Sequence, residues 1–102
     1  MQPEISQNDF QQKTAAGKVL VEFFATWCPH CKRQQPITDE AAEELRGKVV
    51  VYQVDVDKNP ELANEYAPEG FPTYVLFDNG QPAATHAGEW PLAAVLEMVE
   101  AN

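Results

Sequence analysis

Residues 19–32 read VLVEFFATWCPHCK, and this stretch decides both the fold and the chemistry that we expect. It begins with Val19–Ala25, an apolar run interrupted only by Glu22, which is typical of a central strand buried on both faces. Cys28 and Cys31 follow where we expect a helix to begin. The stretch therefore predicts a buried strand that leads two cysteines to the start of a helix.

The helix that begins at the cysteines should run to about Arg46, where Gly47 ends it. Its apolar side chains fall on one stripe, formed by Ile37, Ala41 and Leu45. Pro36 lies inside this helix and should kink it, because proline lacks the amide donor and its ring clashes one turn back.

The remaining elements are predicted from similar patterns. They are an extended segment at Gln2–Ile5, a helix from Ser6 to about Ala16, a strand at Val49–Val54, a helix that starts at Asn59–Glu61, strands at Thr73–Phe77 and Pro82–His86 joined by the turn Asp78–Gly80, and a helix from about Pro91. Strands that alternate with helices and end in a hairpin predict an α/β fold. We expect a mixed central sheet of four to five strands, flanked by helices on both faces.

The length of 102 residues predicts a single domain spanning residues 1–102. Lys and Arg total 7 against 16 Asp and Glu, which gives a formal net charge of −9. This balance argues against binding to nucleic acid or to anionic lipid, since both need clustered cations. No apolar run approaches the roughly 18 residues of a membrane helix. Residues 1–9 do not resemble a secretion signal, so we expect a cytoplasmic protein.

The two cysteines are separated by two residues, and closing so short a loop would constrain the unfolded chain little. This spacing suits a dithiol that exchanges with a disulfide through a mixed-disulfide intermediate. At a helix start, free amide groups and the helix dipole favour an exposed Cys28 thiolate. Cys31 lies one turn further on, within bonding reach. Cys28 is therefore the candidate nucleophile and Cys31 the candidate resolving thiol.

The neighbours of the cysteines should add to this effect. His30 can favour the thiolate as an imidazolium or as an N–H donor, and Lys32 and Arg33 add positive potential. Pro29 fits the first helical turn without loss of a needed donor. A stabilised thiolate favours the reduced protein and makes its disulfide more oxidising.

A metal site is the main alternative for a cysteine pair. A closed zinc site takes four ligands, and the chain offers only Cys28, Cys31, His30 and His86, of which His30 lies too close in sequence to converge easily. Haem attachment needs a histidine directly after the second cysteine, where Lys32 stands. We therefore expect neither a metal nor a cofactor.

Glu22 is the one charged residue in the buried strand, and two interpretations stay open. The carboxylate could reach the sheet edge or solvent, because glutamate is seldom fully buried. Alternatively it is a desolvated acid with a raised pKa that accepts the proton of Cys31 when this thiol attacks. We favour the second interpretation, because the strand is apolar on both sides of Glu22 and leads directly to the cysteines.

The two tryptophans are expected to differ in role. Trp27 adjoins the cysteines and should form part of an apolar rim on which substrate chains settle. Trp90 should serve packing, and we assign His86 no role beyond a structural or solvent-facing one.

Nearly the whole chain resembles the thioredoxin family. Residues 27–32 (WCPHCK) match the family's WCxxCK motif, and Pro36 lies at the position of the family's helix-kinking proline. Residues 55–60 (DVDKNP) resemble the family's acidic segment before the next helix. Residues 71–73 (FPT) match its cis-proline loop, and Gly88 matches its late glycine.

This resemblance implies roles for matching residues. Cys28 would attack the substrate and Cys31 would resolve the intermediate. Pro72 would be cis, and the backbone of Phe71 would pair with an extended substrate chain. Glu22 stands where the family usually has a buried aspartate. The candidate substrate-binding residues are Trp27, Pro29, Phe71, Pro72 and Gly88.

The chain also departs from the family pattern. Typical thioredoxins carry Gly-Pro between the cysteines, whereas this chain carries Pro29 and His30. That dipeptide and residues 21–24 (VEFF) are similar to periplasmic thiol oxidases of the DsbA type, whose additional helical domain has no room in 102 residues. Gln53 stands where many thioredoxins have a lysine near the buried acid.

The resemblance implies a monomeric reductase of protein disulfides, recycled by a thioredoxin reductase with electrons from NADPH. Because Pro29 and His30 replace Gly-Pro between the cysteines, we expect this chain to be less reducing than a typical thioredoxin. One alternative is a thiol oxidase or isomerase that donates its disulfide. Another is a non-catalytic module that uses the same fold for binding.

Overall fold

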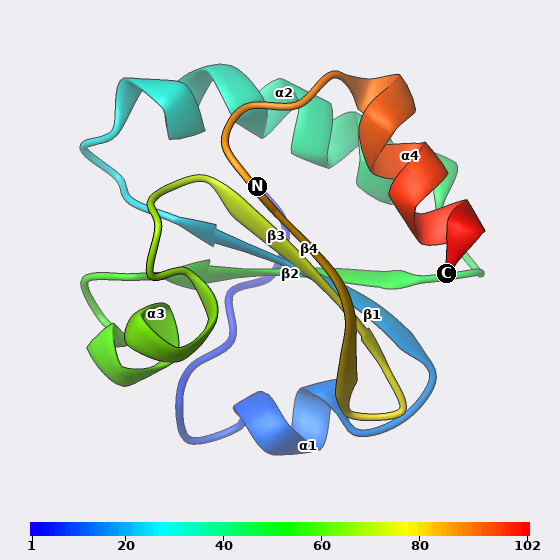
Figure 1. The fold of residues 1–102 in the computed structure, drawn as a ribbon, viewed down its shortest axis with the longest axis horizontal. Helices are drawn as coiled ribbons and strands as arrows, with labels where there is room; N and C mark the ends of the chain where they lie inside the picture. Colours follow the sequence, from blue (N-terminus) through cyan, green and yellow to red (C-terminus); the bar gives the residue numbers. More distant parts are fainter.

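The strands form one mixed sheet in a computed structural model that describes residues 1–102 (Figure 1). The strands are β1 (Lys18–Phe24), β2 (Val50–Asp55), β3 (Thr73–Asp78) and β4 (Gln81–Ala87), and the helices are α1 (Phe10–Thr14), α2 (Pro29–Glu44), α3 (Pro60–Tyr66) and α4 (Leu92–Ala101). The strand order is β2-β1-β3-β4. β2 runs parallel to β1, whereas β3 is antiparallel to both β1 and β4, which confirms the predicted mixed sheet.

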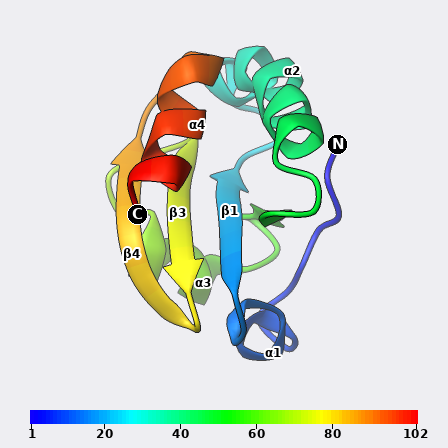
Figure 2. The ribbon, with the colours of Figure 1, turned by 90° about the vertical axis from the view of Figure 1, so that its right-hand side faces the viewer.

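Helices cover both faces of the sheet. Helices α2 and α4 lie over one face, and α1 and α3 lie over the other (Figures 1 and 2). Successive side chains of a strand point to opposite faces, so β1 contributes to two cores. Val21 and Phe23 pack in the core that contains Phe10, whereas Leu20 packs in the core that contains Val95. The predicted α/β class with helices on both faces is confirmed.

The N-terminal segment lies beside β2 without forming a fifth strand. Glu4 makes an isolated parallel bridge to Gln53. The Gln53 amide donates to the Pro3 carbonyl, and the Ile5 amide donates to the Gln53 carbonyl, both at 3.0 Å. Only this short stretch pairs, so the sheet has four strands, the lower number of the predicted range.

Two helices are shorter than predicted. The first begins at Phe10, because residues 7–9 form a turn closed by the bond from the Asp9 amide to the Ser6 carbonyl at 3.2 Å, and the first α-helical bond runs from the Lys13 amide to the Asp9 carbonyl. Helix α2 ends at Glu44 and continues through Pro36 as one element.

No helix in the structure combines the length and apolar character needed to cross a membrane.

The hairpin of β3 and β4 places a free edge on the sheet. The pairing shifts register between Leu76 and Phe77, next to Pro82 on β4. At the other end of β4, the Gly88 amide donates to the Pro72 carbonyl at 2.7 Å. The chain therefore returns from the hairpin to the same end of the sheet at which α2 begins.

Candidate active site

Cys28 is the N-cap residue of α2. Its backbone is extended, and its carbonyl accepts from the Lys32 amide at 3.1 Å, which starts the helix. Pro29 occupies the first turn, where a missing amide donor costs no helical hydrogen bond. The free amide groups of this turn and the helix dipole favour negative charge here, as the sequence predicts.

Both cysteines are free thiols, and both are buried. Cys28 is only 6% exposed, so the expectation of an exposed thiol is wrong. The reason is that the thiol packs against the segment before β3, where its Sγ lies 3.8 Å from the Phe71 carbonyl oxygen. The Phe71 backbone is therefore the nearest part of the cis-proline segment to the Cys28 thiol.

Cys31 lies deeper, on the side of α2 that faces β1. Its Sγ accepts a hydrogen bond from the Ala25 amide at 3.5 Å. Burial raises the pKa of this thiol to about 12, and the nearby Cys28 and Glu22 add to the rise. Cys31 is consequently a protonated thiol at neutral pH.

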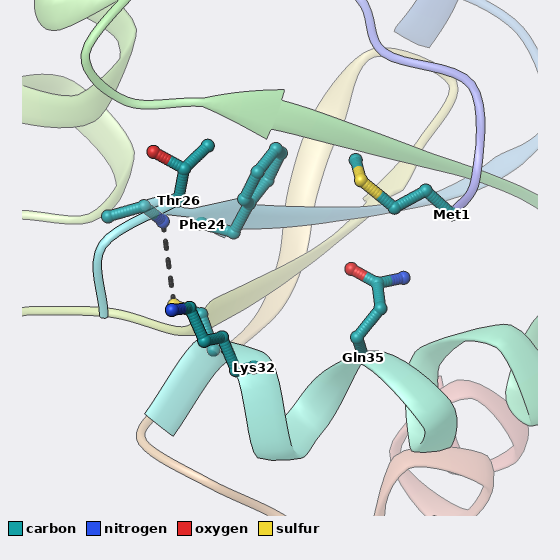
Figure 3. Close-up of a pocket in the computed structure, with 7 residues that line it drawn as sticks. Met1, Phe24, Thr26, Lys32 and Gln35 are labelled. Atoms are coloured by element: carbon teal, nitrogen blue, oxygen red, sulfur yellow. Dashed lines mark hydrogen bonds between the residues drawn. The ribbon is translucent and has the colours of Figure 1, made fainter. Parts of the chain in front are cut away.

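A pocket of about 290 Å³ reaches Cys31 from the side of the N-terminal residues. Figure 3 shows Lys32 and Gln35 on the α2 side of this pocket, and Phe24 and Thr26 on the β1 side. The pocket gives the Cys31 thiol an opening that is separate from the contact between Cys28 and Phe71.

Glu22 is fully buried on β1. Its Oε1 accepts from the Thr38 hydroxyl at 3.0 Å and from Gln53 Nε2 at 2.9 Å, whereas Oε2 has no hydrogen-bond partner. Burial raises the pKa of Glu22 to about 7, although the Thr38 and Gln53 donors oppose the rise. The alternative in which Glu22 reaches the sheet edge or solvent is therefore wrong.

A directed chain of hydrogen bonds ends on Glu22. Gln34 Nε2 donates to the Tyr74 hydroxyl at 2.9 Å, and the Tyr74 and Thr38 hydroxyls contact each other. Because the Thr38 proton is directed to Glu22, the Tyr74 hydroxyl must donate to Thr38. All donors of the chain thus point toward the carboxylate, and each strengthens the next.

The orientation of the Gln53 amide is fixed by its partners. Its Oε1 accepts from the Gln2 backbone amide at 2.8 Å, and a backbone amide is always a donor. The NH₂ group of Gln53 must therefore face Glu22 and the Gln35 oxygen, the latter at 2.9 Å. At the position where many thioredoxins have lysine, Gln53 supplies a donor without a charge. We call Glu22, Thr38 and Gln53 the buried acid cluster.

The segment around Pro72 lies against the cysteines. The Phe71–Pro72 peptide bond is cis, and the Phe71 carbonyl lies near Cys28 as described above. Trp27 is 61% exposed, and its ring meets the Phe71 ring edge to face with centroids 6.4 Å apart. Trp27 Nε1 donates to Asp57 at 2.8 Å. These contacts hold the exposed Trp27 ring beside Phe71, and the role of Trp27 as a rim for substrate chains stays a prediction.

Gly88 joins this surface through its bond to Pro72, with a φ of +105° that favours glycine. His86 and Trp90, to which no role was assigned beyond structure, stack in parallel with ring centroids 3.6 Å apart.

A second polar group lies at the exposed side of the helix start. Glu89 contacts both Arg33 and His30, which lie one turn apart on α2. Arg33 and His30 hold the pKa of the Glu89 carboxyl at about 2, well below its usual range. We call His30, Arg33 and Glu89 the exposed charged cluster. No group of three or more His, Cys, Asp or Glu side chains is placed to bind a metal ion.

Residues 2–101 match the family described as Thioredoxin. The chain belongs to the thioredoxin family. Thioredoxins of the Staphylococcus aureus strains Mu50, MW2 and USA300 are each 35% identical to it over 97 residues. The matched residues cover 95% of this chain and 93% of each relative. As a thioredoxin-family member, the chain is a thiol–disulfide oxidoreductase.

In this thioredoxin-family chain, the structure brings the predicted residues to one end of the sheet. The cysteines, Trp27, Pro29, Phe71, Pro72 and Gly88 surround the start of α2, and Glu22 lies behind Cys31. Sequence reasoning missed Thr38 and Glu89. Thr38 carries no signal beyond its place on the inner side of α2. The signal at Glu89 is an acid directly after the late glycine, and it is readable only once the fold is known.

Proposed function

We propose that this chain reduces disulfides in protein substrates, with Cys28 as the nucleophile and Cys31 as the resolving thiol. The observation that carries the proposal is the placement of Cys28 as the N-cap of α2, with Cys31 one turn further on. The helix start stabilises a thiolate, and the second thiol is within reach of a mixed disulfide.

The reaction follows two exchanges. The Cys28 thiolate attacks one sulfur of the substrate disulfide, forms a mixed disulfide and releases the other substrate sulfur as a thiolate. Cys31 then loses its proton and attacks Cys28 Sγ, which forms the Cys28–Cys31 disulfide and releases the second substrate sulfur. Two electrons pass from the dithiol to the substrate.

Glu22 is our candidate acceptor for the Cys31 proton. Its pKa of about 7 leaves part of the population ionised at neutral pH and able to accept a proton. Both donors of the buried acid cluster bond Oε1, so Oε2 is the oxygen available for that proton. Replacement of Glu22 by Gln should slow the release of the mixed disulfide, and unchanged release kinetics would contradict this role.

The substrate-binding residues follow from the same geometry. A substrate segment that lies along Phe71 brings its sulfur to Cys28, and extended pairing with the Phe71 backbone supplies affinity without dependence on sequence. The Trp27 and Phe71 rings, together with Pro29, Pro72 and Gly88, offer the surrounding contact surface. A thioredoxin reductase is the partner that we expect to regenerate the dithiol.

His30 supports a more oxidising disulfide than that of a thioredoxin with Gly-Pro between the cysteines. A positive charge or N–H donor in the first turn of α2 favours the thiolate, and hence the reduced protein. Prototypes of the reducing and oxidising classes lie at about −270 and −120 mV, and we expect an intermediate value. Equilibration with glutathione buffers measures it, and a value at or below about −270 mV would contradict the expectation.

The decisive test is the reduction of insulin disulfides by two cysteine variants. Cys28→Ser should lose the activity entirely, because no thiolate remains at the helix start. Cys31→Ser should accumulate a mixed disulfide with substrate, detectable by mass spectrometry. A Cys28→Ser protein that keeps the reductase activity would overturn the assignment.

A further inference from the structure

We propose that Arg33 and Glu89 form a clamp that holds the His30 imidazole in one place at the start of α2, whichever protonation state the ring is in. Glu89 is then a positioning residue for thiol–disulfide exchange, because it acts on the cysteines through His30. The inference rests on the proposed function, since it concerns how His30 influences the Cys28 thiolate.

The clamp is built around a forked contact between guanidinium and carboxylate. Arg33 Nε donates to Glu89 Oε1 at 3.0 Å, and Arg33 Nη2 donates to Glu89 Oε2 at 2.9 Å. Such bidentate pairs restrict both partners in distance and angle. The imidazole Nδ1 of His30 lies against this fork, within hydrogen-bond distance of Glu89 Oε2 and 2.8 Å from Arg33 Nη2.

The Nδ1 atom of His30 has a hydrogen-bond partner whether or not it carries a proton. When it carries a proton, as it must in the imidazolium, it donates to Glu89 Oε2. When it carries none, it accepts from Arg33 Nη2. The fork therefore offers an acceptor and a donor to the same ring atom. As a result, the ring can stay in the same place whether or not Nδ1 carries a proton.

The backbone on both sides of Glu89 is anchored. The preceding residue, Gly88, donates its amide to the Pro72 carbonyl at 2.7 Å, and the following residue, Trp90, donates its amide to Gln34 Oε1 at 2.9 Å. Glu89 is thus presented to α2 from a fixed loop. A surface carboxylate on a free loop would have to be ordered before it could hold His30.

The three side chains of the clamp are exposed to solvent, and this limits their contribution to the stability of the fold. The side chains of His30, Arg33 and Glu89 are 60%, 57% and 36% exposed. Ion pairs this open to solvent contribute little to stability, and the forked geometry of this one adds mainly a fixed orientation. Orientation of His30, rather than support of the fold, is the effect that this geometry favours.

The charged groups that face His30 come from three elements. Helix α2 supplies Arg33, and the loop after β4 supplies Glu89. The loop before β3 supplies Glu69, which lines the same hollow of about 360 Å³ as His30 and Glu89. Glu69 makes no hydrogen bond or ion pair with His30, so it is a matched control for the loss of one negative charge nearby.

The test is a double-mutant cycle on the equilibrium with glutathione, in which the protein disulfide and two glutathione molecules yield the protein dithiol and glutathione disulfide. His30→Ala should disfavour the dithiol by about fivefold, which corresponds to the loss of an interaction between two unit charges about 4 Å apart at the dielectric constant of water. In a Glu89→Gln background the same substitution should have less than about a twofold effect, because the ring is no longer held. In a Glu69→Gln background the fivefold effect should remain.

An effect of His30→Ala that is equal in the wild-type and Glu89→Gln backgrounds would overturn the clamp. Equal losses in the Glu89→Gln and Glu69→Gln backgrounds would also overturn it, because they would reveal a general charge effect. If no equilibrium with glutathione is reached in any variant, the proposed function fails instead. Nitrogen-15 NMR of His30 gives an independent readout, in which the hydrogen-bonded Nδ1 signal should be lost in Glu89→Gln and retained in Glu69→Gln.

Discussion

Two glutamates lie near the start of α2, and the pKa values of their carboxyl groups are shifted in opposite directions. Glu22 in the buried acid cluster has a pKa of about 7, whereas Glu89 in the exposed charged cluster has a pKa of about 2. Glu22 has neutral hydrogen-bond donors and no solvent, while Glu89 has an arginine fork and open solvent. Desolvation determines the first shift, and nearby donors and charges determine the second.

The comparison shows how one residue type can serve two tasks beside one pair of cysteines. A carboxyl group that titrates near neutral pH can exchange protons with a thiol. One that stays ionised over the whole physiological range can only orient and balance charge. Variants that remove each carboxyl group, or a donor to it, should therefore differ in how their stability depends on pH.

The largest effect on stability is expected for Glu22→Gln. The raised pKa means that folded Glu22 holds its proton from about pH 4.5, the ordinary value, up to about 7. The wild-type protein should therefore lose about 3 kcal/mol of stability across this window relative to the variant, with the loss complete above pH 7. Urea unfolding at intervals from pH 4 to about pH 9 measures the difference.

If the stability of the wild type and that of Glu22→Gln changed with pH in the same way, the assignment of Glu22 as a buried acid would be contradicted. Glu65→Gln, which removes an exposed carboxylate on α3, serves as the control and should leave the window unchanged.

A smaller effect is expected for Thr38→Val, which removes one donor to Glu22 Oε1 and keeps the shape of the side chain. The ionised form of Glu22 then loses a hydrogen bond, so its pKa should rise above 7 and the stability loss should extend to higher pH. We expect a cost of about 1–3 kcal/mol at alkaline pH, typical of a buried polar group left unpaired. In a Glu22→Gln background this added pH dependence should vanish, and its persistence there would place the effect elsewhere.

The smallest effect on stability is expected for Glu89→Gln. A lowered pKa contributes stability above the ordinary value of 4.5 and loses it as the pH falls toward 2. Because the cluster is exposed, the difference from wild type at pH 6 should be slight, and it should shrink between about 0.1 and 1 M salt. A destabilisation as large as that of Thr38→Val would show that the exposed charged cluster supports the fold.

Most of the fold could be predicted because its signals are local. The apolar run of β1, the turn before β4 and the proline that opens α3 each specify their own element. The predicted limits failed in the N-terminal residues, where a local turn and a distant strand each engage the backbone. Ser6 was expected to start a helix, yet its amide bonds Asp9 in a turn, and the segment beside Gln53 pairs too briefly to become a strand.

The candidate site could be predicted in part for the same reason. The cysteines and Glu22 lie within ten residues of one another, so their relation follows from one strand and one helix start. Thr38 contacts Glu22, which lies 16 positions away in the sequence, and Glu89 contacts His30, which lies 59 positions away. No sequence periodicity encodes such pairs. The burial of Cys28 was also beyond sequence reasoning, because it depends on the approach of Phe71.

The two edges of the sheet have different consequences for association between copies of the chain. The β2 edge is occupied at Gln53 by the N-terminal segment, which takes up backbone groups that another strand could use. The β4 edge is open, but Pro82 offers no amide there and the register shift beside it distorts the ladder. Proline and bulges at an open edge are known means of preventing strand addition. The proposed binding of extended substrate chains at the thiol end is therefore compatible with sheets that resist joining into aggregates.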